Sequence, residues 1–268
     1  MISTDISKIM YHVLMTELKN KIKENKLTIG SWITIGHSSI AEIMGQSQFD
    51  WLAIDLEHSS ISMSQAEELI RAIDLQDISP LVRLTSNNPD QIKRVMDMGA
   101  HGIIIPMVNS ANDAYKAIEA AYYHPTGTRS FGLARAQGYG SNFENYLDWS
   151  KKNTVVIVQI EHINSIDHLD EIFSLDDVDA YIVGPYDLSG SMGIPGDFNN
   201  KDFKDAILSI KSAAKKANKP GGIHIVEPIP SLLVEAINDG FRFLAYGVDF
   251  TMINSACEQG LTKLDEKQ

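Results

Sequence analysis

The sequence predicts a single α/β domain in which eight parallel strands, alternating with helices, close into a (β/α)8 barrel, the TIM barrel. Eight short apolar runs rich in β-branched and aromatic residues recur along the 268-residue chain, and helical periodicity marks most of the intervals between them. This alternation indicates a parallel sheet, and eight units favour closure over an open sheet. A dinucleotide-binding sheet is disfavoured because no glycine-rich fingerprint opens the first unit.

The predicted strands are short, and several end abruptly at a polar or charged residue. In chain order they span 31–35, 51–55, 80–83, 102–106, 157–161, 181–187, 221–225 and 243–247. Runs that are apolar almost throughout are typical of parallel strands buried on both faces. A carboxylate at the end of such a run needs a partner or a cation, because an unpaired charge is costly in a dry interior.

The predicted helices follow most of the strands. They span 40–44, 63–75, 89–98, 111–122, 203–217 and 230–238, and a last helix starts at 251. Ser62 or Ser64 caps the second of these, Pro89 suits the first turn of the third, and Gly99 ends it. The interval 124–153 is rich in glycine and aromatic residues and is predicted to be a long connection, functional or mobile.

One domain is expected to span the whole chain, 1–268. Residues 1–28 form its leading segment, in which apolar residues spaced along one face predict an amphipathic helix over 7–25 that packs on the bottom or side of the barrel. Residues 29–250 form the barrel itself. Residues 251–268 form a C-terminal helix and a polar tail.

Composition and charge restrict the partners. The net charge of −12 argues against nucleic acid and against an anionic membrane surface. Cys257 is the only cysteine, so no disulfide forms within the chain, which fits a reducing cytoplasm. The N-terminus lacks the cationic start and apolar core of a signal peptide, and no run reaches membrane-spanning length. We expect a cytoplasmic protein that binds neither nucleic acid nor membrane.

Polar residues at the carboxyl ends of the predicted strands converge on one face of a barrel. These residues are Glu57, His58, Arg83, Gln159, Glu161 and Asp187. Each type has a structural interpretation as well, since a histidine is often structural, an arginine pairs with a nearby acid, and acids cap helices. So many polar side chains at one rim favour a functional site over a coincidence of separate structural roles.

Two of these residues predict a metal site. Glu161 and Asp187 are 26 residues apart, about the length of one strand–helix repeat, which places two carboxylates side by side on adjacent strands. Carboxylates completed by water form a hard oxygen site suited to Mg²⁺ or Mn²⁺, with too little nitrogen and sulfur for structural zinc. A cation with open positions can chelate a 2-oxoacid and act as a Lewis acid on its carbonyl group.

Arg83 and His58 complete the predicted chemistry. Arg83 would stabilise the oxygen that becomes negative when the carbonyl group enolises. His58 is placed for proton transfer near neutral pH, with Glu57 or Asp55 available to orient it. Because no lysine ends any predicted strand, a Schiff-base mechanism has no nucleophile, and carbonyl chemistry would need the metal.

Five segments together resemble the HpcH/HpaI family of class II pyruvate aldolases, and the match runs from about residue 30 to residue 249. The segments are 49–58 (FDWLAIDLEH), 82–83 (VR), 105–108 (IPMV), 159–161 (QIE) and 184–189 (GPYDLS), in the family's order and spacing. The resemblance implies that Glu161 and Asp187 bind the metal, which is Mg²⁺ or Mn²⁺ with Co²⁺ as a further candidate. It implies that Arg83 binds the pyruvate oxygen and stabilises the enolate, while His58 takes part in proton transfer.

The resemblance also implies substrate contacts and an assembly. Gln159 would help to place the oxoacid, and the backbone around Gly184, Pro185 and Tyr186 would contact the pyruvate carboxylate. Family members are often hexamers in which the last helix exchanges between neighbours, so we expect a homo-oligomer, a trimer or a hexamer. Asp97 matches a catalytic acid that reaches a neighbour's histidine.

Some positions depart from the family's pattern. Tyr186 stands where many relatives have a small residue, Ser59-Ser60 follow the histidine where relatives often have Ala-Pro, and residues 129–132 replace a more glycine-rich loop beside the variable half of the substrate. These changes leave the metal and pyruvate end intact and concern the identity of the aldehyde. Among the remaining histidines, His37 and His224 end strands and are candidates for the pocket wall.

The expected function is that of a metal-dependent aldolase, which cleaves a 4-hydroxy-2-oxoacid to pyruvate and an aldehyde through a metal-bound pyruvate enolate, and which also runs the reverse addition. One alternative is a citryl- or malyl-CoA-type lyase of the same superfamily. That reading ranks lower because those chains are usually longer at the C-terminus and richer in basic residues near the site. The other alternative is a barrel that binds an oxoacid without turning it over, although every residue that a catalyst needs is present.

Overall fold

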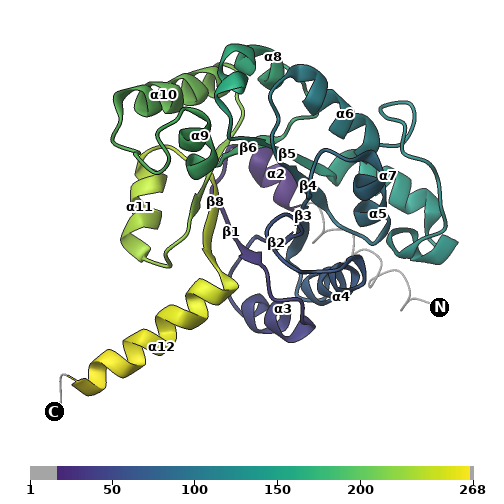
Figure 1. The fold of residues 1–268 in the computed structure, drawn as a ribbon. Helices are drawn as coiled ribbons and strands as arrows, with labels where there is room; N and C mark the ends of the chain where they lie inside the picture. Colours follow the sequence, from purple (N-terminus) through teal and green to yellow (C-terminus); the bar gives the residue numbers. More distant parts are fainter. Residues whose placement is uncertain (1–16, 266–268) are drawn as a thin grey trace.

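The structure, a computed structural model, describes residues 17–265 and contains one closed barrel of eight parallel strands (Figure 1). Neighbouring strands pair in chain order, and β8 closes the barrel against β1. The strands are β1 (Thr28–Ile33), β2 (Trp51–Asp55), β3 (Ser79–Arg83), β4 (Gly102–Ile105), β5 (Val155–Ile160), β6 (Ala180–Val183), β7 (Gly221–Ile225) and β8 (Phe243–Val248). The predicted (β/α)8 fold is therefore confirmed.

Helices cover the outside of the barrel and begin where the sequence provides start signals. They are α2 (Glu17–Lys23), α3 (Ser38–Gly45), α4 (Met63–Asp74), α5 (Pro89–Asp97), α6 (Ala111–Ala121), η1 (Arg135–Gly140), α7 (Phe143–Asn153), η2 (Ile163–His168), α8 (Leu169–Phe173), α9 (Pro185–Ser191), α10 (Lys201–Lys216), α11 (Pro230–Asn238) and α12 (Asp249–Asp265). Ser62 caps α4 and forms a reciprocal capping box with Gln65. Pro89 occupies the first turn of α5, and Gly99 follows that helix with a φ of 101°, which glycine adopts readily.

The inside of the barrel is filled by large aromatic side chains. Trp51 is fully buried and stacks on Phe243 with 4.4 Å between the ring centroids. Gly30 on β1 makes room for this stack, because a Cβ at that position would overlap the Trp51 indole. A second apolar cluster, rich in leucine, isoleucine and valine, lies between the strands and the outer helices. The interior is thus packed like a core, and open space is left for a site at its carboxyl end.

The base of the barrel, at the amino ends of the strands, is closed by α2. Lys19 on α2 is buried and donates three hydrogen bonds, to the Asp179 carboxylate at 3.0 Å, the Tyr122 hydroxyl at 2.9 Å and the Thr154 carbonyl at 2.5 Å. The leading helix packs at the base as expected over the part that the structure describes. Residues 7–16 of that predicted helix lie outside the described residues.

The interval 124–153 differs from the long connection that was predicted. It contains η1 and α7, and Tyr146 and Trp149 of α7 are buried against Tyr123. These aromatic residues are three positions apart, so one face of a helix buries both, and this spacing is the signal that indicated a helix. Between β5 and β6, η2 and α8 form a short helical connection that was also not predicted.

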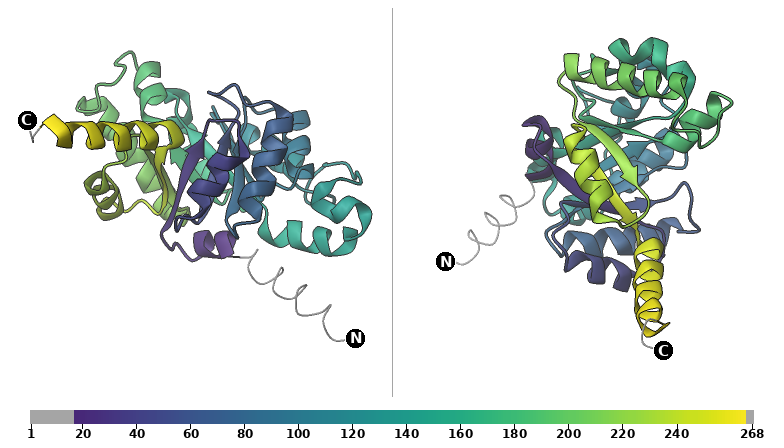
Figure 2. Two further views of the ribbon diagram at one scale, coloured as in Figure 1. Left: turned by 90° about the horizontal axis from the view of Figure 1, so that it is seen from below. Right: turned by 90° about the vertical axis from the view of Figure 1, so that its left-hand side faces the viewer.

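Helix α12 projects away from the barrel instead of packing along it (Figures 1 and 2). Its side chains from Ile253 to Thr262 are largely exposed, including Ile253 at 47% and Leu261 at 65%. Exchange of this helix between subunits stays a prediction. Among the helices that the structure describes, none is both long and apolar enough to cross a membrane.

Candidate active site

A cavity of about 680 Å³ opens at the carboxyl ends of the strands. Seven of the predicted site residues line it, namely His58, Arg83, Gln159, Gly184, Pro185, Tyr186 and Asp187. The other wall of the cavity comes from β7, α10, α11 and the chain on either side of α12's start, and it is mostly apolar, with Glu227, Glu235 and Asp239 also in its lining. The rim that the sequence predicted to be functional is therefore a real concave site.

Arg83 is held by Asp55 on the neighbouring strand. Its Nε and Nη2 atoms donate to the two oxygens of the Asp55 carboxylate, at 2.9 and 2.6 Å. Burial alone would raise the pKa of Asp55, but the hydrogen bond and the positive charge of Arg83 bring it below its ordinary value. The guanidinium carbon also lies 4.4 Å from the centre of the Trp32 ring. The ion pair and the ring fix the guanidinium, and among the described residues none accepts a hydrogen bond from its Nη1.

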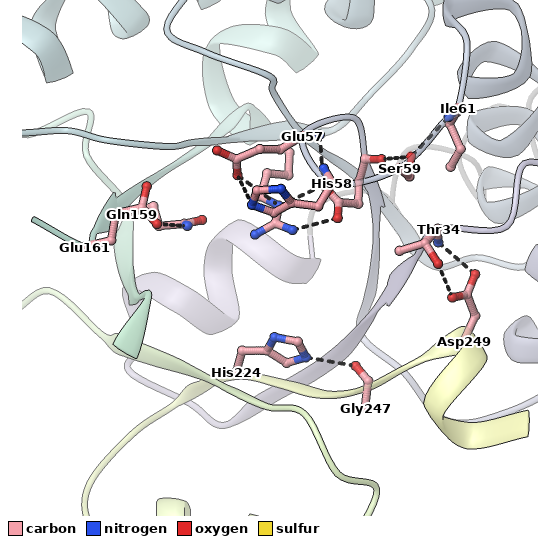
Figure 3. A network of polar contacts seen from close by, with 12 residues as sticks. Thr34, Glu57, His58, Ser59, Ile61, Gln159, Glu161, His224, Gly247 and Asp249 are labelled. Atoms are coloured by element: carbon pink, nitrogen blue, oxygen red, sulfur yellow. Dashed lines mark hydrogen bonds and ion pairs between the residues drawn. The ribbon is translucent and has the colours of Figure 1, made fainter. Parts of the chain in front are cut away.

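Glu57 and His58 lie beside this ion pair (Figure 3). Oε2 of Glu57 is 3.5 Å from Arg83 Nε and 3.7 Å from His58 Nε2, and it is buried without a hydrogen-bond partner. Burial raises the pKa of Glu57 to about 7; the charge of Arg83 opposes the rise, and the charges of three nearby carboxylates add to it. Asp55 is committed to Arg83, so Glu57 is the acid that faces His58. The imidazole of His58 is 64% exposed and reachable from the cavity.

Glu161 is almost fully buried directly after β5. Its Oε1 accepts a 2.6 Å hydrogen bond from the Met107 backbone N–H, and its Oε2 accepts one from the Gln159 side chain. Gly184 packs against this carboxylate, since a Cβ there would come within 2.6 Å of Glu161 Oε2. Burial raises the pKa of Glu161, and the charge of Asp187 contributes to the rise. Glycine at 184 is thus required by close approach to the carboxylate.

Asp187 reaches the same rim from a helix, which corrects the prediction of a strand over 181–187. Strand β6 ends at Val183, Gly184 is the N-cap of α9, and Pro185 takes the first position of that helix. Proline is favoured there because its missing N–H has no partner in the first turn. Asp187 lies in the same turn and is exposed, where the helix dipole favours a negative charge.

The donor set fits a divalent cation. Four carboxylates, those of Asp55, Glu57, Glu161 and Asp187, interact at this rim. Arg83 is in contact with two of them, Asp55 and Glu57. Gln159 Oε1 and Glu57 Oε2 are buried oxygen acceptors without a donor. Among the described residues no set of three or more acids, histidines or cysteines forms a complete metal cage. Glu161 and Asp187 would therefore leave several coordination positions for water or substrate, as oxygen-binding Mg²⁺ sites do.

Asp97 lies outside the cavity within one chain. Its carboxylate forms a 2.5 Å ion pair with Arg129, whose guanidinium is buried and lies over the rings of Tyr123 and Tyr146. Neither Asp97 nor any of residues 129–132 appears among the described residues that line the cavity. The expectation that 129–132 flank the variable half of the substrate therefore does not hold within a single chain.

Sequence reasoning missed several residues that shape the site. The Trp32 ring packs against the Arg83 guanidinium. The sequence signal for this role was an aromatic residue in a strand that the barrel buries. Asp249 accepts hydrogen bonds from the backbone N–H groups of Thr34 and Ile35, both at 2.7 Å, and so ties the loop after β1 to the start of α12. His224 lines the cavity, as considered from its position. His37 instead caps α3 by accepting from the Ser39 N–H, and it is absent from the cavity wall among the described residues.

Comparisons with known proteins identify the family of this chain. The model of the HpcH/HpaI aldolase/citrate lyase family matches residues 28–256, and the chain belongs to this family. The matched region contains every described element that contributes to the rim. The predicted class of protein, a carbon–carbon lyase of the aldolase type, is thereby confirmed.

The relatives are similar over nearly their whole length. The chain is 33% identical to the hydroxypyruvate/pyruvate aldolase of Sagittula stellata over 89% of this chain and 93% of that one. It is 31% identical to the 2-keto-3-deoxy-L-rhamnonate aldolase of Escherichia coli strain UMN026 over 94% of both chains. A crystal structure of an HpcH/HpaI aldolase/citrate lyase family protein from Burkholderia cenocepacia superposes with a TM-score of 0.88 at 27% identity, covering 93% of this chain and 99% of the other.

Proposed function

We propose that the protein is a metal-dependent aldolase that cleaves a 4-hydroxy-2-oxoacid to pyruvate and an aldehyde, and that adds pyruvate to an aldehyde in reverse. The observation that carries the proposal is that Arg83 and Asp187 line one cavity, while the buried Glu161 carboxylate lies directly behind Gln159 and Gly184 of the same wall. Two acids suit a cation, and a fixed guanidinium suits an oxygen that gains negative charge. The names of the two aldolase relatives support the same reaction class.

The metal would be held by Glu161 and Asp187. Their oxygen donors fit Mg²⁺ or Mn²⁺, with Co²⁺ as a further candidate. When bound, such a cation supplies a Lewis acid that polarises the keto group of the oxoacid. The excess of carboxylates at the rim supports a cation at this place, because each acid raises the proton affinity of the next.

The chain's own residues would bind and orient the oxoacid. Arg83 lines the cavity and would stabilise the enolate oxygen, since its position is fixed by Asp55 before substrate arrives. Gln159 lies beside Glu161 and would help to place the oxoacid. The first turn of α9 presents backbone N–H groups of Tyr186 and Asp187, which suit the substrate carboxylate at the positive end of the helix.

Proton transfer would be carried by His58 with Glu57 beside it. In cleavage, a base removes the proton of the 4-hydroxyl group, the C3–C4 bond breaks, the aldehyde forms, and the electron pair of that bond enters the enolate. A proton delivered to C3 then gives pyruvate. His58 is exposed to the cavity, and the raised pKa of Glu57, about 7, would let that carboxyl exchange protons near neutral pH.

The aldehyde would lie toward the apolar wall. Tyr186 narrows the entrance to that side, where its ring meets Phe198 edge to face at 5.0 Å between the centroids. The wall behind them is built from aliphatic and aromatic side chains of α10, α11 and β7. Tyr186 therefore stands where it would limit the size of the aldehyde.

An assembly of several copies is part of the proposal. Asp97 pairs with Arg129 and does not line this chain's cavity, so a catalytic role for it would be at a neighbour's histidine. Helix α12 extends away from its own barrel, as a helix that packs on another subunit would (Figure 2). These features suit a trimer or a hexamer. The proposed location is the cytoplasm, and the proposed small-molecule partners are pyruvate and an aldehyde.

A direct experiment separates a catalyst from a binding protein. The purified protein is mixed with Mg²⁺ or Mn²⁺, pyruvate and a panel of short aldehydes, and the loss of pyruvate and the formation of 4-hydroxy-2-oxoacids are followed by NMR. We expect metal-dependent addition with at least one aldehyde. Pyruvate binding without addition to any aldehyde and without proton exchange at its methyl group would contradict the proposal.

A further inference from the structure

His224 on β7 lines the cavity on the side of the barrel opposite β3, the strand that carries Arg83. Figure 3 shows its imidazole across the barrel from Glu57 and His58. Its Nε2 lies 3.3 Å from the carbonyl oxygen of Gly247. A carbonyl oxygen only accepts, so Nε2 carries the hydrogen. The same carbonyl accepts from Ser31 Oγ at 3.2 Å, and Gly247 holds it in place with a φ of 66°. The orientation of the imidazole is thus fixed by the backbone.

The imidazole is neutral at physiological pH. Burial lowers the pKa of His224 to about 4, and the positive charge of Arg83 lowers it further, against the hydrogen bond to Gly247 and the charge of Asp55. A neutral imidazole carries one proton, which Nε2 uses toward Gly247. Nδ1 therefore bears a lone pair and acts only as a hydrogen-bond acceptor.

This acceptor has no donor within the chain. Among the described residues none donates a hydrogen bond to Nδ1. The aromatic ring beside the imidazole is that of Trp32, which meets it edge to face with 5.6 Å between the ring centroids. The guanidinium carbon of Arg83 lies 4.4 Å from the centre of the same Trp32 ring. Nδ1 is not among the buried polar atoms that lack a partner, so it is open to the cavity that His224 lines, and a hydroxyl group bound there can donate to it. Trp32 therefore contacts both His224 and the Arg83 guanidinium, which would bind the substrate.

We propose that Nδ1 of His224 accepts a hydrogen bond from a hydroxyl group on the carbon skeleton of the substrate, so that hydroxylated substrates are preferred over those without the hydroxyl. The inference rests on the proposed aldolase function and narrows its substrate class. The hydroxyl belongs either to C3 of the oxoacid, as in hydroxypyruvate, or to the aldehyde, as in glycolaldehyde. Both sources offer the same donor.

Two substrate pairs and three variants test this inference on the full-length protein with Mn²⁺. The oxoacid pair is hydroxypyruvate and pyruvate, each with propanal; the aldehyde pair is glycolaldehyde and acetaldehyde, each with pyruvate. His224→Leu removes both nitrogens. His224→Gln keeps an amide near Nε2 for Gly247 but lacks an acceptor at Nδ1, whereas His224→Asn places an oxygen near Nδ1. The measured quantity is the ratio of kcat/KM for the hydroxylated substrate to that for its partner.

We expect His224→Leu and His224→Gln to lower this ratio about 10- to 100-fold in one of the two pairs, because the substrate hydroxyl loses its acceptor. The pair that responds identifies the source of the hydroxyl. His224→Asn should restore the ratio to within about threefold. The Gln variant keeps the test intact if the Leu variant is unstable.

Two results overturn the inference in different ways. If the Leu and Gln variants keep the ratio within about twofold of wild type in both pairs, and pyruvate exchange is normal, the proposed role of His224 is refuted. The proposed aldolase function would still stand. A wild-type protein that shows neither exchange nor cleavage with any metal would refute the aldolase function and this inference with it.

Discussion

Two buried clusters of charge lie at opposite ends of the same barrel, and they are satisfied in different ways. At the base, the Lys19 ammonium has three N–H donors and uses all of them within the chain, on Asp179, Tyr122 and Thr154. Asp179 in turn accepts from the Val156 backbone N–H at 2.9 Å. A buried charge whose partners are all supplied by the protein has a structural role. Removal of one of those partners lowers the stability of the fold.

At the mouth, the protein leaves its charges incompletely partnered. Arg83 forms close contacts with Asp55 and Glu57, while Glu161 and Asp187 add further negative charge to the same space. Buried acceptor oxygens there remain without donors. The difference suggests a division of roles: the charges at the base are satisfied by folding alone, whereas under the proposed function those at the mouth would be completed by a cation and a substrate. Stability should therefore depend on the base and activity on the mouth.

Arg83→Ala gives the largest expected effect. Removal of the guanidinium should lower both retro-aldol turnover and exchange of the pyruvate methyl protons by at least about 10³-fold, because the developing oxyanion loses its fixed donor. Arg135→Ala is the matched control, since Arg135 pairs with Asp74 at 2.8 Å away from the cavity. That control should keep exchange within about threefold per folded molecule. Full exchange activity in Arg83→Ala would end the proposed assignment of this residue.

Glu161→Gln should weaken binding of Mn²⁺ by about 100-fold, because an anionic ligand is replaced by a neutral amide of the same shape. Titration of free Mn²⁺ by electron paramagnetic resonance measures this affinity. Asp170→Asn serves as the control, since Asp170 is exposed and pairs with Lys216 on the outer surface. Equal affinity for Mn²⁺ in wild type and Glu161→Gln would place the cation elsewhere.

Lys19→Met tests the other end of the barrel. Loss of the ammonium leaves Asp179 buried without its cation and should lower the free energy of unfolding by about 3–5 kcal/mol, as measured by urea denaturation. Exchange of pyruvate protons per folded molecule should stay at the wild-type rate, because Lys19 lies at the far end of the barrel from the cavity. Loss of exchange at unchanged stability would contradict the division of roles between the two ends.

The pH dependence of metal binding is the smallest expected effect. Glu57 and Glu161 have raised pKa values, that of Glu57 being about 7, so protons compete with the cation below neutral pH. The affinity for Mn²⁺ should rise about tenfold at most between about pH 6 and pH 8, with release of protons on binding. The Glu57→Gln variant should flatten this rise. An affinity that falls as the pH rises over this range would contradict the sign of the effect.

The sequence was sufficient for the parts of the molecule in which local pattern and fold agree. Apolar runs at regular spacing predicted all eight strands, and Ser62 and Pro89 marked helix starts correctly. The residues that follow β2, β3 and β5 were placed at one rim because parallel strands end on the same face. That rule needs no side-chain detail, which is why Arg83 and Glu161 could be named in advance.

Of the remaining features, one was signalled in the sequence but assigned wrongly, and two depend on contacts that a linear pattern does not contain. Asp187 was assigned to a strand, although Gly184 and Pro185 before it signal the start of a helix. The choice of Asp55 over Glu57 as the partner of Arg83 follows from the register of β2 against β3, in which Asp55 and Arg83 are direct neighbours. The role of His224 depends on the tautomer that Gly247 imposes across two strands.

The central claim is that a cation at Glu161 and Asp187, together with Arg83, makes a 2-oxoacid into a carbon nucleophile. Deuterium exchange into the methyl group of pyruvate in D₂O, followed by proton NMR with no aldehyde present, tests it most directly. The account predicts exchange that appears on addition of Mg²⁺ or Mn²⁺, stops with a chelator and returns with excess metal. Exchange that continues unchanged after chelation, or that no divalent cation induces, would contradict it.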